Sequence, residues 1–92
     1  MTPEAAERLA LAALQWIAAR DDIAGSFLAA AGAAPEDLRA RAADPAFLGF
    51  VLDHLLTRDD WVVGFAQHAG LAPDRVMVAR QTLPGGDAPV WT

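Results

Sequence analysis

Two histidines, His54 and His68, are the residues of this sequence best suited to bind a metal ion. Together with Asp53, Asp59 and Asp60 they could supply imidazole and carboxylate ligands. Two ligands on one face of a helix need the spacing His-x-x-x-His or Glu-x-x-His, and the sequence has neither. We therefore expect no metal site, and we expect both histidines to be partly buried or at the surface.

Other catalytic patterns are also missing. Ser26, the single serine, follows Gly25 on a predicted helix and lacks the context of a nucleophile elbow. The chain has no cysteine and no lysine, so it has neither a thiol nucleophile nor the lysine of a phosphate-binding loop. Gly85 and Gly86 follow a predicted helix and indicate a turn. The sequence thus implies no enzyme activity, no cofactor and no small-molecule ligand.

The charge of the chain disfavours two classes of partner. The net charge is −5, whereas binding to nucleic acid or to an anionic membrane depends on summed positive charge. The apolar run 9–19 is shorter than the roughly 20 residues of a membrane span. Glu4 and Glu7 precede this run, where a signal peptide would carry positive charge. We expect a cytoplasmic protein.

The elements that position these side chains are predicted to be helices. Thr2-Pro3-Glu4 combines the hydroxyl N-cap, the early proline and the acid that are typical of a helix start. On a helical wheel, the apolar residues that follow share one broad face: Ala6, Leu9, Ala10, Ala13, Leu14, Trp16 and Ile17. Leu11 falls in the opposite, polar stripe, so we expect it to be exposed and treat it as a candidate partner contact.

Further helix boundaries follow along the chain. Arg20-Asp21-Asp22 ends the first helix and starts the second, with an aspartate expected as the N-cap, and Gly32 ends that second helix. Pro35 starts a third helix that runs to about Ala43. Asp44-Pro45 then opens a fourth helix, whose apolar side chains cover most of its circumference. A helix that is apolar on nearly all sides belongs in the centre of the fold.

The same boundaries return 38 positions later. At this offset, identical or similar residues recur at junctions, turns and core positions: Arg58-Asp59-Asp60 for Arg20-Asp21-Asp22, Phe65 for Phe27, Gly70 for Gly32, and Ala72-Pro73-Asp74 for Ala34-Pro35-Glu36. We interpret residues 9–45 and 47–83 as two diverged copies of one unit, packed about a pseudo-twofold axis. The prediction is an all-α fold, a compact orthogonal bundle of five or six short helices with two similar three-helix halves. Residues 1–84 form one domain, and residues 85–92 form an extended tail.

A resemblance covers nearly the whole chain. Its residues are Phe27-Leu28, Gly32, the run 35–41, the run 44–48, the run 51–53, Phe65-Ala66, Gly70-Leu71, Pro73, Arg80 and the run 83–85. With these residues the chain resembles a family of all-helical alphaproteobacterial proteins of about 90 residues, a domain of unknown function. The resemblance implies a bacterial, helical, single-domain protein and implies no catalytic or binding residue.

One motif points to DNA as an alternative. Ala66, Gly70 and Val76 have the spacing of the small residue, turn glycine and core residue in DNA-binding helix-turn-helix motifs. The helix after the turn offers three side chains for contacts to DNA: Arg75, Arg80 and Gln81. Asp74 at the start of that helix would repel a phosphate, as would the negative net charge.

The leading hypothesis is therefore a noncatalytic protein-interaction or structural module of the bacterial cytoplasm. Its expected partner is a protein, with a homodimer among the alternatives, and no membrane. Trp91 is the best single aromatic anchor, since tryptophan is enriched at interface hot spots, and it docks either on its own core or on another chain.

Overall fold

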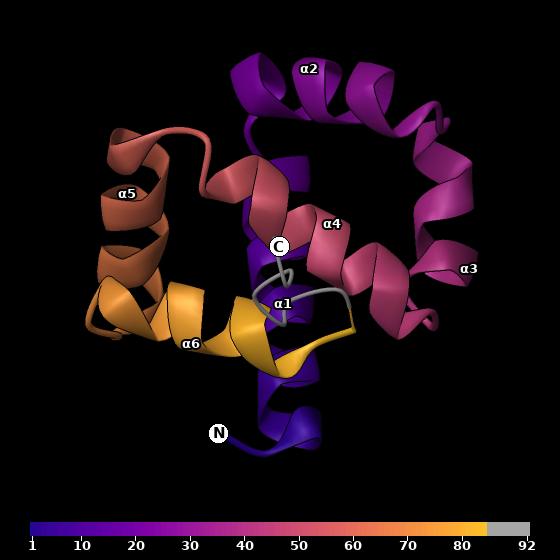
Figure 1. The fold of residues 1–92 in the computed structure, drawn as a ribbon. Helices are drawn as coiled ribbons and strands as arrows, with labels where there is room; N and C mark the ends of the chain where they lie inside the picture. Colours follow the sequence, from indigo (N-terminus) through magenta and orange to yellow (C-terminus); the bar gives the residue numbers. More distant parts are fainter. Residues whose placement is uncertain (85–92) are drawn as a thin grey trace, which may run out of the picture.

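Six α-helices and one 3₁₀ turn form the part of the chain that the computed structural model describes, residues 1–84 (Figure 1). In chain order they are α1 (Pro3–Ala18), α2 (Asp21–Ala31), η1 (Pro35–Asp37), α3 (Leu38–Arg41), α4 (Pro45–Leu55), α5 (Asp59–Ala69) and α6 (Asp74–Thr82). No strand occurs within these residues, so the predicted all-α class and the number of helices are confirmed. The predicted tail 85–92, with Trp91, lies outside the described residues.

Helix α1 begins as its sequence predicts. The hydroxyl of Thr2 accepts a hydrogen bond from the backbone N–H of Ala5 at 3.1 Å, and Pro3 is the first helical residue. The buried residues of α1 are those of the predicted apolar face: Ala6, Leu9, Ala10, Ala13, Leu14, Trp16 and Ile17. None of the helices between residues 1 and 84 is long and apolar enough to cross a membrane.

The capping predicted at the two Arg-Asp-Asp junctions is wrong. The N-cap residues of α2 and α5 are Arg20 and Arg58, and no side chain caps either helix. The aspartates lie inside the first turn, where their negative charge interacts favourably with the positive end of the helix dipole. Asp44, the N-cap of α4, does accept the expected hydrogen bond, from the backbone N–H of Ala46 at 3.0 Å.

Both glycines predicted to end helices do so in the left-handed conformation. Gly32 has φ of 63° and Gly70 has φ of 71°, and they are the two residues with positive φ between residues 1 and 84. Glycine has no Cβ and adopts this conformation without steric cost, so each glycine stops its helix and turns the chain.

The third predicted helix is split. Pro35–Asp37 form a 3₁₀ turn, and regular α-helix follows only for the four residues of α3. Neither η1 nor α3 contributes a fully buried side chain. Leu38 and Ala42 are half-buried and rest against the edge of the core.

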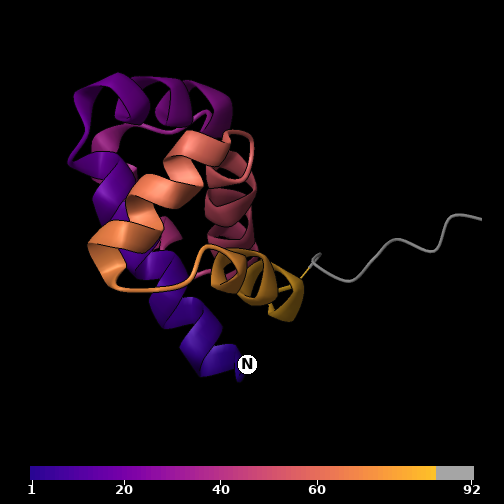
Figure 2. The ribbon, with the colours of Figure 1, turned by 90° about the vertical axis from the view of Figure 1, so that its left-hand side faces the viewer.

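The core lies between α1 and α4. Helix α1 packs against α2, α4, α5 and α6, and α4 also packs against α6. The buried residues of α4 are Phe47, Leu48, Gly49, Val51, Leu52 and Leu55, as expected for a helix at the centre. Figure 2 shows that the first turns of α1 project beyond the other helices.

The two predicted halves share part of their structure and differ in another part. Helices α2 and α5 have the same length and both end at a left-handed glycine. Their following helices differ: α6 is buried against α1 and α4 through Val76 and Ala79, whereas α3 stays at the periphery. The pseudo-twofold relation of the halves stays a prediction.

Candidate functional site

An apolar groove runs along the outer side of α1. It consists of two adjoining hollows of 240 and 280 Å³, which share Leu14, Ala18 and Leu38. The first hollow continues toward α2 and η1, and the second continues along α1 toward Leu11 and along α3. Their further lining residues are Ile17, Asp21, Ala24, Phe27, Leu28 and Pro35 in the first, and Gln15, Arg39 and Ala42 in the second. The lining is therefore mostly apolar and offers little for chemistry.

Leu11 is the most exposed large apolar side chain of this groove, with 36% of its surface accessible. It belongs to a stripe on α1 whose members recur at alternating intervals of three and four residues: Glu4, Glu7, Leu11, Leu14 and Ala18. This spacing keeps the five side chains on one side of a helix, as along the seam of a coiled coil. The predicted exposure of Leu11 is confirmed, and the structure places it on the rim of the groove.

Two charged side chains lie next to this groove. Glu7 comes one turn before Leu11 on α1, and Arg39 borders the groove from α3. Neither side chain forms an ion pair within residues 1–84, since the ion pairs there join Arg58 with Asp60 and Arg80 with Asp53. The groove thus has an apolar centre with an acidic residue toward the start of α1 and a basic residue at its side.

Apart from this groove, a polar cleft of 560 Å³ opens between the end of α1, the start of α2 and the length of α5. Its lining residues are Trp16, Arg20, Asp22, Ile23, Asp60, Trp61, Gly64, Gln67 and His68. The chain's own cations already cover the two indole rings, because Arg20 lies 4.8 Å from the centre of the Trp16 ring and Arg58 lies 5.3 Å from that of Trp61. Asp60 is held by Arg58 at 2.9 Å, and this pairing lowers the pKa of Asp60. The chain's own arginines therefore already contact both indole rings and the carboxylate of Asp60.

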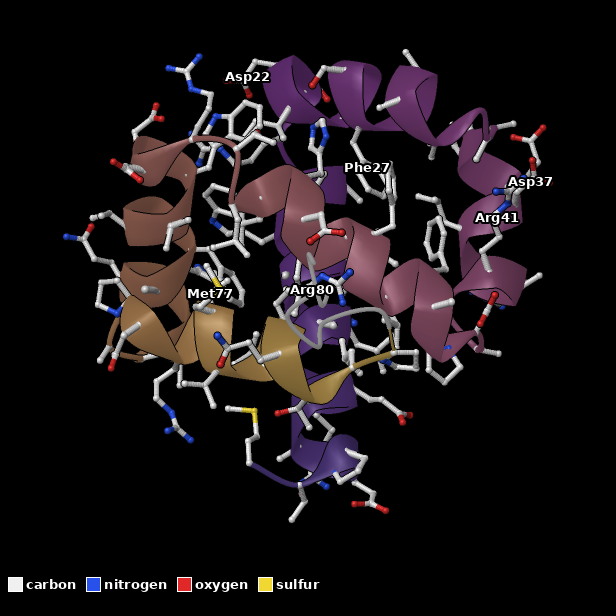
Figure 3. The ribbon with its side chains drawn as sticks, viewed as in Figure 1. Asp22, Phe27, Asp37, Arg41, Met77 and Arg80 are labelled. Carbon is white, nitrogen blue, oxygen red and sulfur yellow. The ribbon has the colours of Figure 1, made fainter. Side chains whose placement is uncertain are left out.

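His54 lies in a cluster of aromatic rings. It stacks on Trp61 with ring centres 5.4 Å apart and meets Phe27, which extends from α2 toward α4, edge-on at 5.4 Å (Figure 3). Its Nε2 lies 3.4 Å from the hydroxyl of Ser26. Burial lowers the pKa of His54, which favours the neutral ring.

The contact between Ser26 and His54 lacks the features of a catalytic pair. The Ser26 hydroxyl donates to the backbone carbonyl of Ile23 at 2.9 Å, so its proton is directed away from the imidazole. No carboxylate between residues 1 and 84 hydrogen-bonds to the His54 ring to orient it. His68 is exposed at the polar cleft. Within residues 1–84, no three histidine or acidic side chains are grouped to hold a metal ion.

The three predicted DNA contacts have different environments. Arg80 points from α6 toward α4, and only 14% of its side chain is exposed (Figure 3). Its Nε and Nη2 donate to the two carboxylate oxygens of Asp53, over 2.5 and 3.0 Å, and its Nη1 donates to the carbonyl of Pro84 over 3.1 Å. Arg80 therefore ties α6 to α4. Arg75 and Gln81 are exposed on α6.

Comparison with known proteins places the whole helical frame in one family. A family model described as a protein of unknown function, DUF3572, matches residues 3–86. The chain belongs to the DUF3572 family. The resemblance seen in the sequence is thereby confirmed as to the family, whereas the alphaproteobacterial origin stays a prediction. No curated protein and no solved structure matches this DUF3572 chain.

The DUF3572 match begins at the first residue of α1 and extends beyond α6, so it includes the stripe on α1, both left-handed glycines and the groove. Sequence reasoning found Leu11 but missed Leu38 and Arg39 as its neighbours. The three-four spacing of Glu4, Glu7 and Leu11 was available as a signal, since it marks a surface seam. The position of α3 beside α1 had no such signal, because it depends on how the chain returns after Gly32.

Proposed function

We propose that this DUF3572 protein is a noncatalytic protein-interaction module that binds its partner in the groove along α1. The observation that carries the proposal is the apolar lining of that groove around Leu14, Ala18 and Leu38, with Leu11 exposed at its rim. Contiguous apolar surface that stays open to solvent marks interaction sites in many proteins.

The shape and chemistry of the groove favour a protein as the ligand. It is shallow, follows the axis of a helix, and has few polar groups that could fix the orientation of a small metabolite. The side chains of a partner helix or loop would cover such a groove, and the charged residues beside it, Glu7 and Arg39, would give the pairing its register.

A capture experiment with matched variants tests this function. Leu38→Arg places a charge in the middle of the groove, and Leu11→Arg places one at its rim. Met77→Arg is the control, because Met77 on α6 is 46% exposed and does not line the groove (Figure 3). We expect at least one protein captured by the wild-type chain, including a second copy of itself, to be lost with both groove variants and kept with the control. If every captured protein were retained by all three variants, the groove would not be the binding surface.

Binding of DNA through residues 65–82 has less support. Arg80 is used within the fold, and Asp74 lies at the start of α6 beside the exposed Arg75. Fluorescence anisotropy with a mixed-sequence duplex at low salt tests this alternative, because nonspecific binding is strongest there. Binding that Arg75→Gln and Gln81→Ala both weaken would favour the alternative over the groove.

A further inference from the structure

We infer that the occupant of the groove is a second copy of this chain, packed antiparallel along α1 about a twofold axis at Leu11. The inference rests on the proposed function, because it names the partner that the groove binds. It is carried by the order of apolar and charged residues along the stripe Glu4, Glu7, Leu11, Leu14 and Ala18, and by the position of Arg39 beside it.

The centre of the stripe can pair with itself. When two copies of α1 lie antiparallel with Leu11 at the axis, each Leu11 meets its own counterpart. Glu7, four residues before Leu11, then comes to the level of Gln15, four residues after Leu11 on the other copy. Glu4, seven residues before Leu11, comes to the level of Ala18 of the other copy, which is small and exposed and leaves room for this acidic side chain.

The charges of the two copies complement each other in this arrangement. Arg39 borders the same hollow as Gln15 and Ala18, which is the level that Glu7 of the other copy reaches. The twofold axis lies in the interface and is perpendicular to α1. It reverses the direction of α1 and leaves α3 of both copies on the same side of the interface. Glu7 is one heptad before Leu14, on the edge of the stripe that faces α3, so Glu7 of one copy meets Arg39 of the other. The symmetry forms this pair twice.

The parallel arrangement lacks this complementarity. Two parallel copies would bring Glu7 against Glu7 and leave both Arg39 side chains without an acid at their level. Like charges facing each other disfavour that pairing, and the same repulsion selects the antiparallel register.

The molar mass in solution tests the association itself. Size-exclusion chromatography with light scattering should give about twice the mass of the 92-residue chain, which is 9.7 kDa. Leu11→Arg puts two arginines against each other at the axis, and we expect it to raise the dimer dissociation constant at least about tenfold. Met77→Arg adds the same charge outside the stripe and should leave the constant unchanged. A wild-type chain that stays monomeric from about 10 µM to about 1 mM would overturn the inference.

Charge reversal tests the register. Glu7→Arg alone places two pairs of arginines in contact, and Arg39→Glu alone places two pairs of glutamates in contact, so each should weaken the dimer at least about tenfold. Mixing the two single variants should restore a dimer, because a heterodimer has both pairs with opposite charges. The double variant E7R/R39E should also dimerise. Helical circular dichroism of each variant serves as the check on folding.

The remaining outcomes separate this inference from the proposed function. If the single variants were monomeric and their mixture were too, Glu7 and Arg39 would not be partners and the inference would be overturned. A different outcome is a wild-type chain that is monomeric and captures another protein that the Leu38→Arg variant does not capture. In that case the inference would fail and the proposed function would stand. A dimer unaffected by Leu11→Arg would show that another surface forms it.

Discussion

The ring of Phe27 meets the ring of His54 edge-on, with centres 5.4 Å apart and planes inclined by 73°. Phe65 and Trp16, which are the counterparts of these residues at the offset of 38, make the same kind of contact at 6.1 Å and 65°. Each phenylalanine thus packs against the first helix of the other predicted half. This exchange supports a twofold arrangement of duplicated units, which itself stays a prediction.

The environment of His54 predicts a pH dependence of stability. Burial lowers the pKa of His54 in the folded protein below its ordinary value of 6.5, so the unfolded chain binds this proton more readily. The free energy of unfolding is therefore at its full value above about pH 6.5 and falls as the pH drops through 6.5 toward the folded pKa. Urea denaturation at about pH 7.5 and about pH 5.5 measures this loss.

Two histidine variants test whether this pH dependence comes from His54. His54→Gln should remove this part of the pH dependence, whatever its own effect on stability. His68→Gln should keep it, since His68 is exposed and lies outside the cluster of rings around Phe27. An unchanged slope between the two pH values in His54→Gln would contradict the assignment to His54.

Alanine substitutions at two glycines within helices are expected to have opposite effects on the free energy of unfolding. A Cβ on Gly49 would lie 2.8 Å from Nη1 of Arg80 and 3.2 Å from the carbonyl oxygen of Pro84, so the Arg80 guanidinium would have to shift away from its hydrogen bonds to Asp53 and Pro84. We expect Gly49→Ala to cost about 1–3 kcal/mol of unfolding free energy, as overpacked cores do. Gly25 has nothing within 4 Å of that position, and Gly25→Ala should stabilise α2 by about 0.5–1 kcal/mol. Chemical denaturation measures the change in the free energy of unfolding for both variants. Changes of the same sign would contradict the prediction.

Arg80 is predicted to contribute to stability. Arg80→Gln removes both hydrogen bonds to Asp53, and because the Asp53 side chain is 53% exposed we expect a cost of only about 1–2 kcal/mol. Arg75→Gln, at an exposed position of the same helix, should change the free energy of unfolding by less than about 0.5 kcal/mol. Thermal denaturation compares the two. Equal effects of the two variants would argue against a structural role for Arg80.

Alanine substitutions at the two left-handed glycines are expected to lower the free energy of unfolding by similar amounts. Alanine at Gly32 or Gly70 meets no neighbouring atom within 4 Å, so its cost is conformational, about 1–2 kcal/mol in each case. Asparagine tolerates this conformation better, so Gly32→Asn and Gly70→Asn should be milder than the alanine variants. Urea denaturation of the four variants measures these differences. A milder effect of alanine than of asparagine would rule out this explanation.

The sequence predicted the features that depend on local signals. The Thr2 cap, the ends of α2 and α5 at Gly32 and Gly70, and the buried face of α1 each follow from residues within a turn or two of one another. The junction caps were predicted wrongly because an aspartate is equally suited to the N-cap and to the first turn. At both junctions the chain places an arginine at the N-cap.

Contacts between distant residues were beyond such reasoning. Arg80 pairs with a carboxylate 27 positions earlier, and Ser26 approaches an imidazole 28 positions later. Both contacts depend on how whole helices cross, and helix crossings are set by many side chains together. The groove is of the same kind: Leu11 was identified from its own helix, whereas Arg39 joins it only because α3 returns beside α1.

The placement of η1 and α3 has a consequence for the dynamics of the groove. This segment forms one wall and is attached to the core mainly through the half-buried Leu38 and Ala42. Segments with so few buried contacts open locally at a smaller free energy than global unfolding requires, so their backbone amides should exchange with deuterium before those of α1 and α4. The width of the groove can then adjust to its occupant while the central helices keep their packing.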